Sequence, residues 1–541
     1  MAAGLPLETS TLTSLHALDL ITIAGYLLVT LLIGLSFAKR KETSEDYFLA
    51  GRRLTWPVLG ASLFSTNISA EHLVGLAGEA HRVGLSVGGF EWMACFCLLT
   101  LAFVFVPQYL NTRIYTIPEF LERRFSLAAR MVLSGYFLVM IVLTKISIAL
   151  WAGGLVVHTL FGWDMQTVMW SIGIFTAIYT AAGGLSAVVY TDAFQTVVFL
   201  AGSAFLTVTA LNAAGGWSGV ASRVPEGFLH MVKPVTDPDY PITGFIFGNY
   251  FGGMFYWCMD QVIVQRVLGA RDIEQGKKGA IFAGFLKILP VFIFVLPGAI
   301  AAALYPNISH DAAYPTLVSQ LVPIGLRGLI LAGLLAALMS SLSSISNSAA
   351  TLVTHDFVVR FCKTPPGQDT QIWIGRATTA VVMVAGILWA PVIGQAETLW
   401  KYLQVVSAYM GLPMAAALLT GILWKRATNA GALAAMGFGV VLGGVMLLDS
   451  MMAPQGGLIP FLQTPVMTSF MHRSFLAFLI SISVMGLVSL YTKPPRTEQV
   501  DGVCFEWASN QSVGNTRLLG SSRFWGALLA VTALTCWIAF R

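Results

Sequence analysis

A polar interruption within an apolar run constrains this chain more than any other feature. The run covers residues 56–80 and is long enough to cross a bilayer. Its middle contains four polar side chains, those of Asn67, Ser69, Glu71 and His72. Polar groups at mid-membrane depth are costly unless they face a partner, an ion or water. The pattern therefore predicts a helix broken halfway through the membrane, whose free carbonyl groups and half-helix ends can hold a cation and a polar solute.

The composition places this broken helix in a polytopic helical membrane protein. Of 541 residues, 56% are hydrophobic and only 11% are charged, whereas soluble chains carry about 25% charged residues. The net charge of +5 gives no reason to expect a nucleic-acid partner. The six cysteines have no metal-site or disulfide spacing. The chain lacks a nucleotide-binding glycine loop and a nucleophile elbow, so we expect neither an ATP-driven pump nor an enzyme.

Windows of roughly 17 to 25 apolar residues predict fourteen membrane helices. The first is expected to be a retained helix, because it has no cleavage-site pattern. The ninth is too long for one span, and we expect Pro323 and Gly325 to separate a short external helix from the membrane helix. The predicted spans are 19–38, 56–80, 88–108, 129–157, 166–183, 191–213, 243–266, 278–304, 316–358, 375–395, 397–424, 428–449, 468–491 and 524–540.

The positions of the basic residues predict the orientation. Most of the 31 Lys and Arg residues lie in the connections that follow odd-numbered helices. By the positive-inside rule these connections are cytoplasmic, so both termini are expected outside.

An inverted repeat is expected from the helix parity. The seventh helix contains Gly252 and Gly253 ahead of an aromatic cluster, and we predict an interruption there. This helix lies five helices after the first broken one and therefore enters from the opposite side. A five-plus-five inverted repeat places the site between the two broken helices. The expected domains are 1–55, the first repeat 56–213, an extracellular loop 214–242, the second repeat 243–424, and three C-terminal helices 425–541.

The ninth helix contains a dense serine run at residues 340–348. One interpretation is close helix packing, with the hydroxyl groups bonding to the preceding turn. The other is a Na⁺ cage, since a hard cation prefers oxygen ligands. The expected ligands are the hydroxyl groups of Ser340 and Ser341 and the carbonyl groups of Ala337, Ser65 and Ile68. Asp192 is either a solvated helix cap or, with Ser343 and Ser344, a second sodium site.

Charged and polar residues in other spans suggest a solute pocket. Glu91 and Lys287 would each cost about 2.5–3.5 kcal/mol at mid-membrane, so they form either a structural ion pair or solute contacts. Together with Asn67, His72 and Gln404 they supply both donors and acceptors, as a polyol or sugar requires. Tyr256 and Trp257 either stack on a sugar ring or are interfacial aromatics. Lys145 has no evident sequence partner, and we expect a structural ion pair.

Several motifs give the chain a resemblance to a known family. They are residues 44–52 (SEDYFLAGR), 67–72 (NISAEH), 90–92 (FEW), 114–120 (IYTIPEF), 183–192 (GGLSAVVYTD), 256–258 (YWC), 260–266 (DQVIVQR) and the serine run. With these motifs the chain resembles the sodium:solute symporters, and within them the sodium/glucose (galactose) cotransporter branch, over about residues 20–490.

The resemblance implies an all-α, LeuT-like fold of fourteen helices and a Na⁺-coupled importer of a neutral hexose that works by alternating access. It implies the sodium ligands and sugar-contacting residues named above, with Tyr256 as inner gate. Two departures from the family pattern stand out: Gly253 replaces a usual Asn or Thr, and Trp400 with Lys401 replaces an outer-gate Phe and its neighbour. The alternatives are a sodium symporter for inositol, a nucleoside, or a carboxylate or sialate, and a non-transporting sensor or channel. We expect a bacterial inner-membrane protein whose partners are Na⁺ and sugar, with no obligate protein partner.

Overall fold

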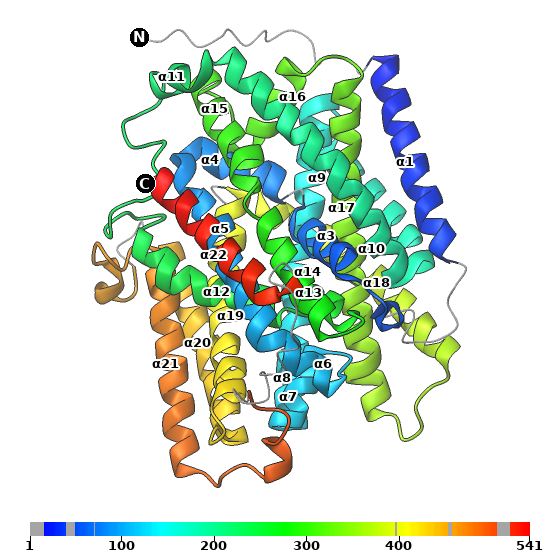
Figure 1. Ribbon diagram of the computed structural model, residues 1–541, viewed down its shortest axis with the longest axis vertical. Helices are drawn as coiled ribbons and strands as arrows, with labels where there is room; N and C mark the ends of the chain where they lie inside the picture. The colour runs from blue at the N-terminus through cyan, green and yellow to red at the C-terminus, as the bar shows by residue number, and fades with distance from the viewer. Residues whose placement is uncertain (1–15, 39–48, 70, 395–397, 453–456, 506–519) are drawn as a thin grey trace.

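The protein is almost entirely helical (Figure 1). The computed structural model describes residues 16–38, 49–69, 71–394, 398–452, 457–505 and 520–541. The helices of the first part are α1 (Ala17–Ala38), α3 (Trp56–Asn67), α4 (Ala77–Val83), α5 (Gly89–Thr100), α6 (Val106–Thr112), α7 (Ile117–Arg124), α8 (Leu127–Met140), α9 (Ser147–Phe161), α10 (Met165–Ala213) and α11 (Gly216–Ala221). Those of the second part are α12 (Tyr250–Met259), α13 (Gln261–Leu268), α14 (Ile273–Leu286), α15 (Leu296–Leu304), α16 (Ala313–Leu321), α17 (Leu326–Thr351), α18 (Gln368–Ile393), α19 (Leu399–Leu423), α20 (Asn429–Met452), α21 (Phe470–Tyr491) and α22 (Ser522–Ala539).

Wide π-helical turns interrupt several of these helices. They are η2 (Glu71–Leu76), η4 (Leu101–Phe105), η5 (Ile141–Ile146), η6 (Gly244–Asn249), η7 (Val291–Val295) and η9 (Leu352–Val359). Short 3₁₀ turns are η1 (Ala50–Arg52), η3 (Gly84–Gly88), η8 (His310–Ala312), η11 (Pro460–Gln463) and η12 (Thr497–Gln499). Turns of the π type are often found at functional sites, and three of these, η2, η5 and η6, contribute residues to the central pocket described below.

The predicted break in the first apolar run is confirmed. Helix α3 ends at Asn67, and Ile68 has extended backbone angles (φ −78°, ψ 104°). The chain then continues into η2 and α4. An extended residue at this position leaves the last carbonyl groups of α3 without helical partners.

The second break lies at Asp260, so the interruption predicted at Gly252 and Gly253 is wrong. Both glycines are inside α12, whereas Asp260 is extended (φ −69°, ψ 129°) between α12 and α13. The Asp260 side chain accepts a hydrogen bond from the Val262 N–H at 2.9 Å. This cap starts α13 as a new helix, which explains why the break falls at an aspartate rather than at the glycine pair.

Glycines allow the halves of the first broken helix to approach their neighbours closely. A Cβ atom on Gly60 of α3 would lie 2.7 Å from the Gly279 carbonyl oxygen of α14. A Cβ atom on Gly298 of α15 would lie 2.1 Å from the Ala77 carbonyl oxygen of α4. Small residues at such contacts let helix backbones pack tightly in a membrane.

The helix α10 differs from the prediction of two spans at 166–183 and 191–213. Helical backbone continues from Met165 to Ala213, because the intervening residues 184–190 contain no proline that would interrupt the hydrogen bonds. The prediction of a separate connection there is therefore wrong. The division of the ninth apolar run is confirmed, since α16 ends at Leu321 and α17 begins at Leu326.

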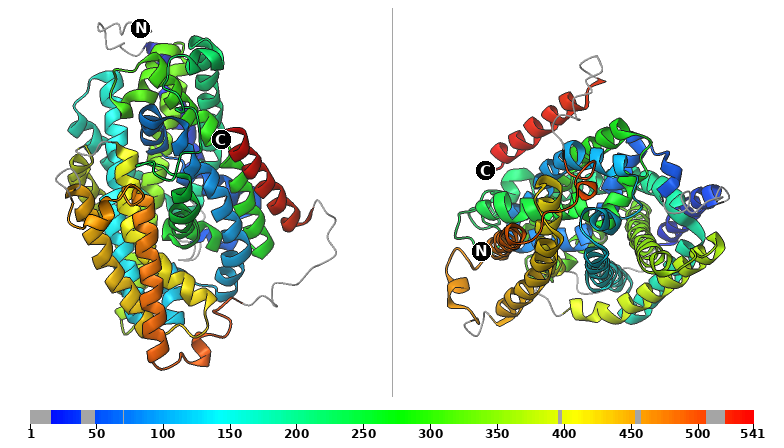
Figure 2. Two further views of the ribbon diagram at one scale, coloured as in Figure 1. Left: turned by 90° about the vertical axis from the view of Figure 1, so that its left-hand side faces the viewer. Right: turned by 90° about the horizontal axis from the view of Figure 1, so that it is seen from below.

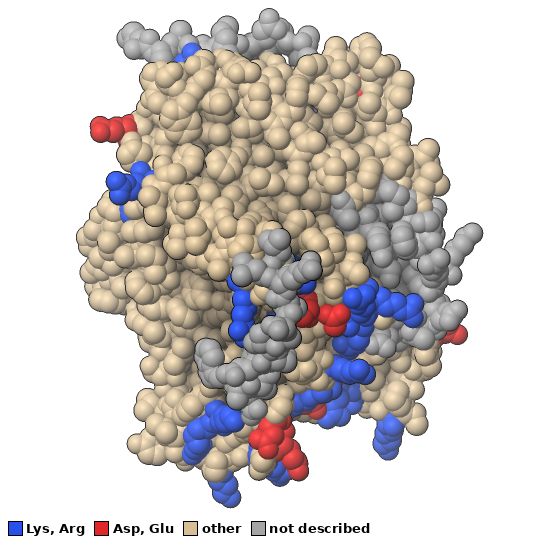
Figure 3. Space-filling model, in the orientation of Figure 1, with Lys and Arg blue, Asp and Glu red and all other residues tan. Residues whose placement is uncertain are grey.

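Ten helices within the described residues are long and apolar enough to cross a membrane. The broken helices divide single crossings into shorter pieces, so the predicted count of fourteen stays a prediction. Helices α20 and α21 lie together at one edge of the bundle, and α22 packs on α5 and α14 (Figures 1 and 2). Outward side chains such as Leu388 and Ile538 are exposed, as lipid contact requires. Lys and Arg gather on the lower part of the face in Figure 3.

Candidate functional site

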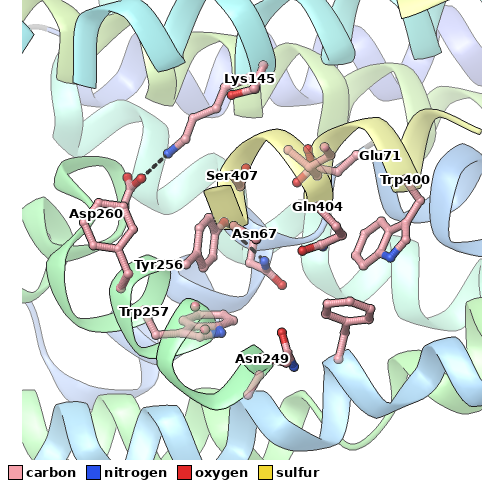
Figure 4. Close-up of a pocket in the computed structure, with 18 of the residues that line it drawn as sticks. Asn67, Glu71, Lys145, Asn249, Tyr256, Trp257, Asp260, Trp400, Gln404 and Ser407 are labelled. Carbon is pink, nitrogen blue, oxygen red and sulfur yellow. Dashed lines mark hydrogen bonds and ion pairs between the residues drawn. The ribbon is translucent and has the colours of Figure 1, made fainter. Parts of the chain in front are cut away.

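A buried cavity of about 150 Å³ lies between the two broken helices (Figure 4). Its walls come from α3 and η2, α5, η5, α12, the C-terminus of α14, α17 and α19. All seven residues predicted to contact solute line it: Asn67, His72, Glu91, Tyr256, Trp257, Lys287 and Gln404. The structure therefore brings together side chains from five separate segments of the chain.

Lys287 is the centre of a charged cluster in this cavity. It is 1% exposed, and its Nζ donates to Asn67 Oδ1 at 2.5 Å and to Glu91 Oε2. The other Glu91 oxygen lies 3.4 Å from His72 Nε2. The ion pair anticipated between Glu91 and Lys287 is present, and both partners also line the cavity. Because the two opposite charges of this buried pair compensate each other, the pair can offer hydrogen-bonding atoms to a neutral solute and leaves no unpaired charge.

Tyr256 and Trp257 close the cavity on the side of the second break. The Asn67 Nδ2 donates to the Tyr256 hydroxyl oxygen at 3.2 Å, which connects the two broken helices directly. The rings of Tyr256 and Trp257 pack edge to face, with centroids 5.3 Å apart. The Lys287 ammonium lies 5.6 Å from the Trp257 ring centroid.

Lys145 has a partner that the sequence did not reveal. Its Nζ donates to Asp260 Oδ2 at 2.6 Å and lies 5.5 Å from the Tyr256 ring centroid (Figure 4). The predicted structural pairing of Lys145 is confirmed, and its partner is the residue that breaks the second helix. The pair ties η5 to the point where α12 ends and α13 begins.

Helix α17, which carries Ala337 and Ser341, packs against α3, which carries Ser65. Ser65, Ile68, Ala337 and Ser341 are all buried. Ser341 lines the cavity beside Thr66 and Asn67, and its hydroxyl oxygen has no hydrogen-bond partner among the described residues. A buried hydroxyl group without a partner costs free energy unless something occupies the space beside it. The donor set, serine hydroxyl oxygens with carbonyls from the end of α3 and from α17, fits a hard monovalent cation.

The proposed second site is only partly described. Ser343 and Ser344 are buried, and their hydroxyl groups also lack partners among the described residues. Asp192 lies within the helical backbone of α10 rather than at a helix start, so the interpretation as a helix cap is wrong. The side chains of Asp192 and Ser340 lie outside the part of the structure that is described.

Trp400, Ser407 and Asn249 are among the lining residues that the sequence prediction did not include as solute contacts. Trp400 and Ser407 lie on the same face of α19 as Gln404, and Asn249 is in η6. The spacing of 400, 404 and 407 is the i, i+4, i+7 pattern of one helix face, a signal that was available in the sequence. The position of Asn249 depends on the π-helical turn and had no such signal.

Two interrupted helices around a buried, charge-balanced polar pocket define a membrane transporter. Solved structures support this fold. The chain superposes on a Na⁺-coupled sialic acid symporter with a TM-score of 0.75 and 22% identity, covering 89% of this chain and 99% of that one. It also resembles Mhp1, a nucleobase-cation-symport-1 family transporter, with a TM-score of 0.57 and 16% identity over 86% of this chain and 99% of that one.

Sequence comparison gives the family. Residues 47–439 match the sodium:solute symporter family. The chain is 36% identical to a sodium/mannose cotransporter of Bos taurus, covering 96% of this chain and 95% of that protein. It is 35% identical to sodium/glucose cotransporter 4 of Mus musculus, covering 95% and 81%. It is 33% identical to sodium/myo-inositol cotransporter 2 of Homo sapiens, covering 92% and 80%. The chain belongs to the sodium:solute symporter family, as the motifs in its sequence predicted.

Proposed function

We propose that this protein is a Na⁺-coupled symporter that imports a neutral hexose by alternating access. The pairing of Lys287 with Glu91 and Asn67 carries the proposal. These groups, with His72 and Gln404, surround the cavity with donors and acceptors in a charge-balanced arrangement. Relatives named for glucose, mannose and myo-inositol support a polyhydroxylated solute.

The proposed architecture has fourteen membrane spans, two of them carried by the 49-residue helix α10, with residues 56–213 and 243–424 as inverted five-span repeats. The remaining segments are 1–55, the external loop 214–242 and the C-terminal helices 425–541. The concentration of basic residues on the lower part of Figure 3 supports a cytoplasmic lower side and external termini. The cell membrane, here a bacterial inner membrane, is the proposed location.

Sodium is proposed to bind where α3 ends against α17. Its ligands are the carbonyl groups of Ser65, Ile68 and Ala337 and the hydroxyl groups of Ser340 and Ser341. Occupation of this site ties the first broken helix to α17 and orders the neighbouring Asn67 for solute. A second ion at Asp192, Ser343 and Ser344 belongs to the same proposal.

Release of sodium towards the cytoplasm loosens α3 from α17. The hydrogen bond from Asn67 to Tyr256 then weakens, and Tyr256 moves away from the solute. One charge crossing about 100 mV gains roughly 2.3 kcal/mol. At about 1.4 kcal/mol per decade, one sodium supports about fiftyfold accumulation and two support on the order of a thousandfold.

Inositol is the second candidate solute, because it presents the same ring of hydroxyl groups and a relative is named for it. A carboxylate or sialate fits less well, since the Lys287 and Lys145 ammonium groups that line the cavity are already paired with Glu91 and Asp260. A nucleoside would use the aromatic pair more than the charged cluster. A sensor or channel would bind or pass solute without concentrating it.

Uptake into proteoliposomes tests the proposal. Labelled glucose, galactose, mannose and myo-inositol are offered with and without an inward sodium gradient. Concentrative, sodium-dependent uptake is expected for at least one hexose and is expected to be lost in Glu91→Ala and Gln404→Ala. Ser483→Ala is the matched control, since that hydroxyl group is exposed and bonds to its own helix at Leu479. Uptake of no hexose, or uptake indifferent to sodium, would refute the proposal.

A further inference from the structure

Trp400 occupies the first turn of α19, at the rim of the cavity (Figure 4). It is 3% exposed, and its indole ring packs edge-on against two residues that also line the cavity. The centroid distances are 5.3 Å to His72 and 5.6 Å to Phe90. These contacts fix the plane of the indole against the charged cluster around Glu91.

The indole N–H of Trp400 has no acceptor among the described residues. This nitrogen can only donate, and a buried donor without a partner costs free energy. A buried Trp normally finds an acceptor for its N–H. Trp400 lines the cavity, so a molecule held there is the available source of an acceptor for this N–H.

The residues on either side of Trp400 are held by side chains of other segments. The Thr398 hydroxyl group donates to Glu79 Oε2 at 2.6 Å, which fixes the start of α19 to α4. Lys401 Nζ lies 3.1 Å from Asp239 Oδ1, in the connection between α11 and η6. Burial alone would raise the pKa of Asp239. Hydrogen bonds and charges from Arg82, and then from Lys401, outweigh burial and hold that pKa below its usual value. The carboxylate therefore stays charged and keeps this contact.

Leu399 adds a third attachment. Its backbone N–H donates to Asp311 Oδ2 at 3.1 Å, in the short turn η8. On the inner side, η2 packs closely against this turn. A Cβ atom on Gly75 would lie 2.7 Å from the Leu399 side chain and 3.2 Å from the backbone nitrogen of Trp400. The turn carrying Trp400 is thus attached to η2 and α4 of the first broken helix, to η8, and to the connection between α11 and η6.

We propose that Trp400 contacts the transported solute directly and donates its indole N–H to one oxygen of the bound polyol. The residue then determines specificity by requiring an acceptor at that position of the ring. It acts together with Gln404, one turn further along α19, which offers a donor and an acceptor to neighbouring oxygens. This inference rests on the proposed transport of a polyhydroxylated solute. It also connects solute recognition to those other segments, since the contacts of Thr398, Leu399 and Lys401 place the donor.

The test is a cycle of protein and solute changes in proteoliposomes. Trp400→Phe keeps an aromatic ring and removes the donor. Deoxy analogues of the transported hexose remove one solute oxygen at a time. We expect Trp400→Phe to raise the half-saturating hexose concentration by about two- to twelvefold, as the loss of one neutral hydrogen bond implies. The maximal rate, and the half-activating sodium concentration at saturating hexose, are expected to stay unchanged.

One deoxy analogue identifies the contact. The unaltered protein should bind this analogue more weakly than the hexose, by a factor similar to the effect of Trp400→Phe. The Trp400→Phe variant should bind the analogue and the hexose equally well. Trp537→Phe is the matched control. The Trp537 N–H also lacks a partner among the described residues, but its ring lies in α22 against Trp92 and does not line the cavity. It should leave hexose affinity unchanged.

The outcomes separate the two proposals. If the unaltered protein concentrates no polyol, the proposed function fails and this inference falls with it. If it transports hexose but Trp400→Phe leaves affinity unchanged, or every deoxy analogue loses affinity equally in both proteins, the contact with Trp400 is refuted alone. Should the phenylalanine variant not fold, Trp400→Leu, which also removes the donor, takes its place in the same cycle.

Discussion

Replacing Lys287 by methionine should destabilise the protein as well as stop transport. The ammonium group is fully buried and bonds to Asn67 and Glu91. Methionine fills a similar volume but leaves the Glu91 carboxylate without its ammonium partner, beside the His72 imidazole. Breaking one partner from a buried ion pair costs about 3–5 kcal/mol, whereas removing both charges leaves no unpaired charge. Lys287→Met should therefore be much less stable than Lys287→Met combined with Glu91→Gln.

The buried cysteines provide the assay. Cys95, Cys97 and Cys258 are buried, so in a Cys362→Ser background, which removes the exposed thiol, a thiol-reactive fluorophore reports unfolding in detergent as the temperature rises. The single variant should melt well below the unaltered protein, and the double variant should recover most of the difference. Hexose uptake should be lost in both, which separates stability from solute recognition. Equal melting temperatures for the single and double variants would refute the view that Lys287 neutralises Glu91.

Three further predictions concern the ion site, the second break and the orientation. Ser341→Ala should raise the half-activating sodium concentration about tenfold or more, because it removes one bond to a charged group. Ser483→Ala should leave that concentration unchanged, and an unchanged value for Ser341→Ala as well would exclude Ser341 from the sodium site. A double-mutant cycle of thermal stability should give a coupling of about 0.5–3 kcal/mol between Lys145→Met and Asp260→Asn. Additive effects of the two substitutions would show that this ion pair does not stabilise the second break. Cys362, the exposed cysteine between η9 and α18, should react with an impermeant maleimide in inside-out vesicles only, with Cys362→Ser as control; labelling from outside would reverse the topology.

Hydrophobicity and polarity alone located the first break and the pocket residues. Asn67 and His72 stand out because polar groups at mid-membrane need a reason, and Glu91 and Lys287 stand out for the same cause. These signals are local in the sequence. The family resemblance rests on the same residues and was confirmed by comparison.

The second break could not be placed by the same reasoning. Gly252 and Gly253 weaken a helix in general, yet α12 continues through them and packs on α5 and α19. Asp260 ends the helix through a side-chain cap, and its charge is matched by Lys145, which lies 115 residues away in the sequence. No local pattern specifies a pairing of that kind. An Asp at a helix start was a usable signal, but it competes with many polar residues that do not break helices.

The balance point of hexose accumulation tests the central claim most directly. Proteoliposomes with equal sodium on both sides and a potassium diffusion potential of about 100 mV, inside negative, are given labelled hexose until net flux stops. Coupling to one sodium predicts an inside-to-outside hexose ratio of about fifty, and coupling to two predicts one on the order of a thousand. A ratio of one at this potential, with sodium present, would contradict the account.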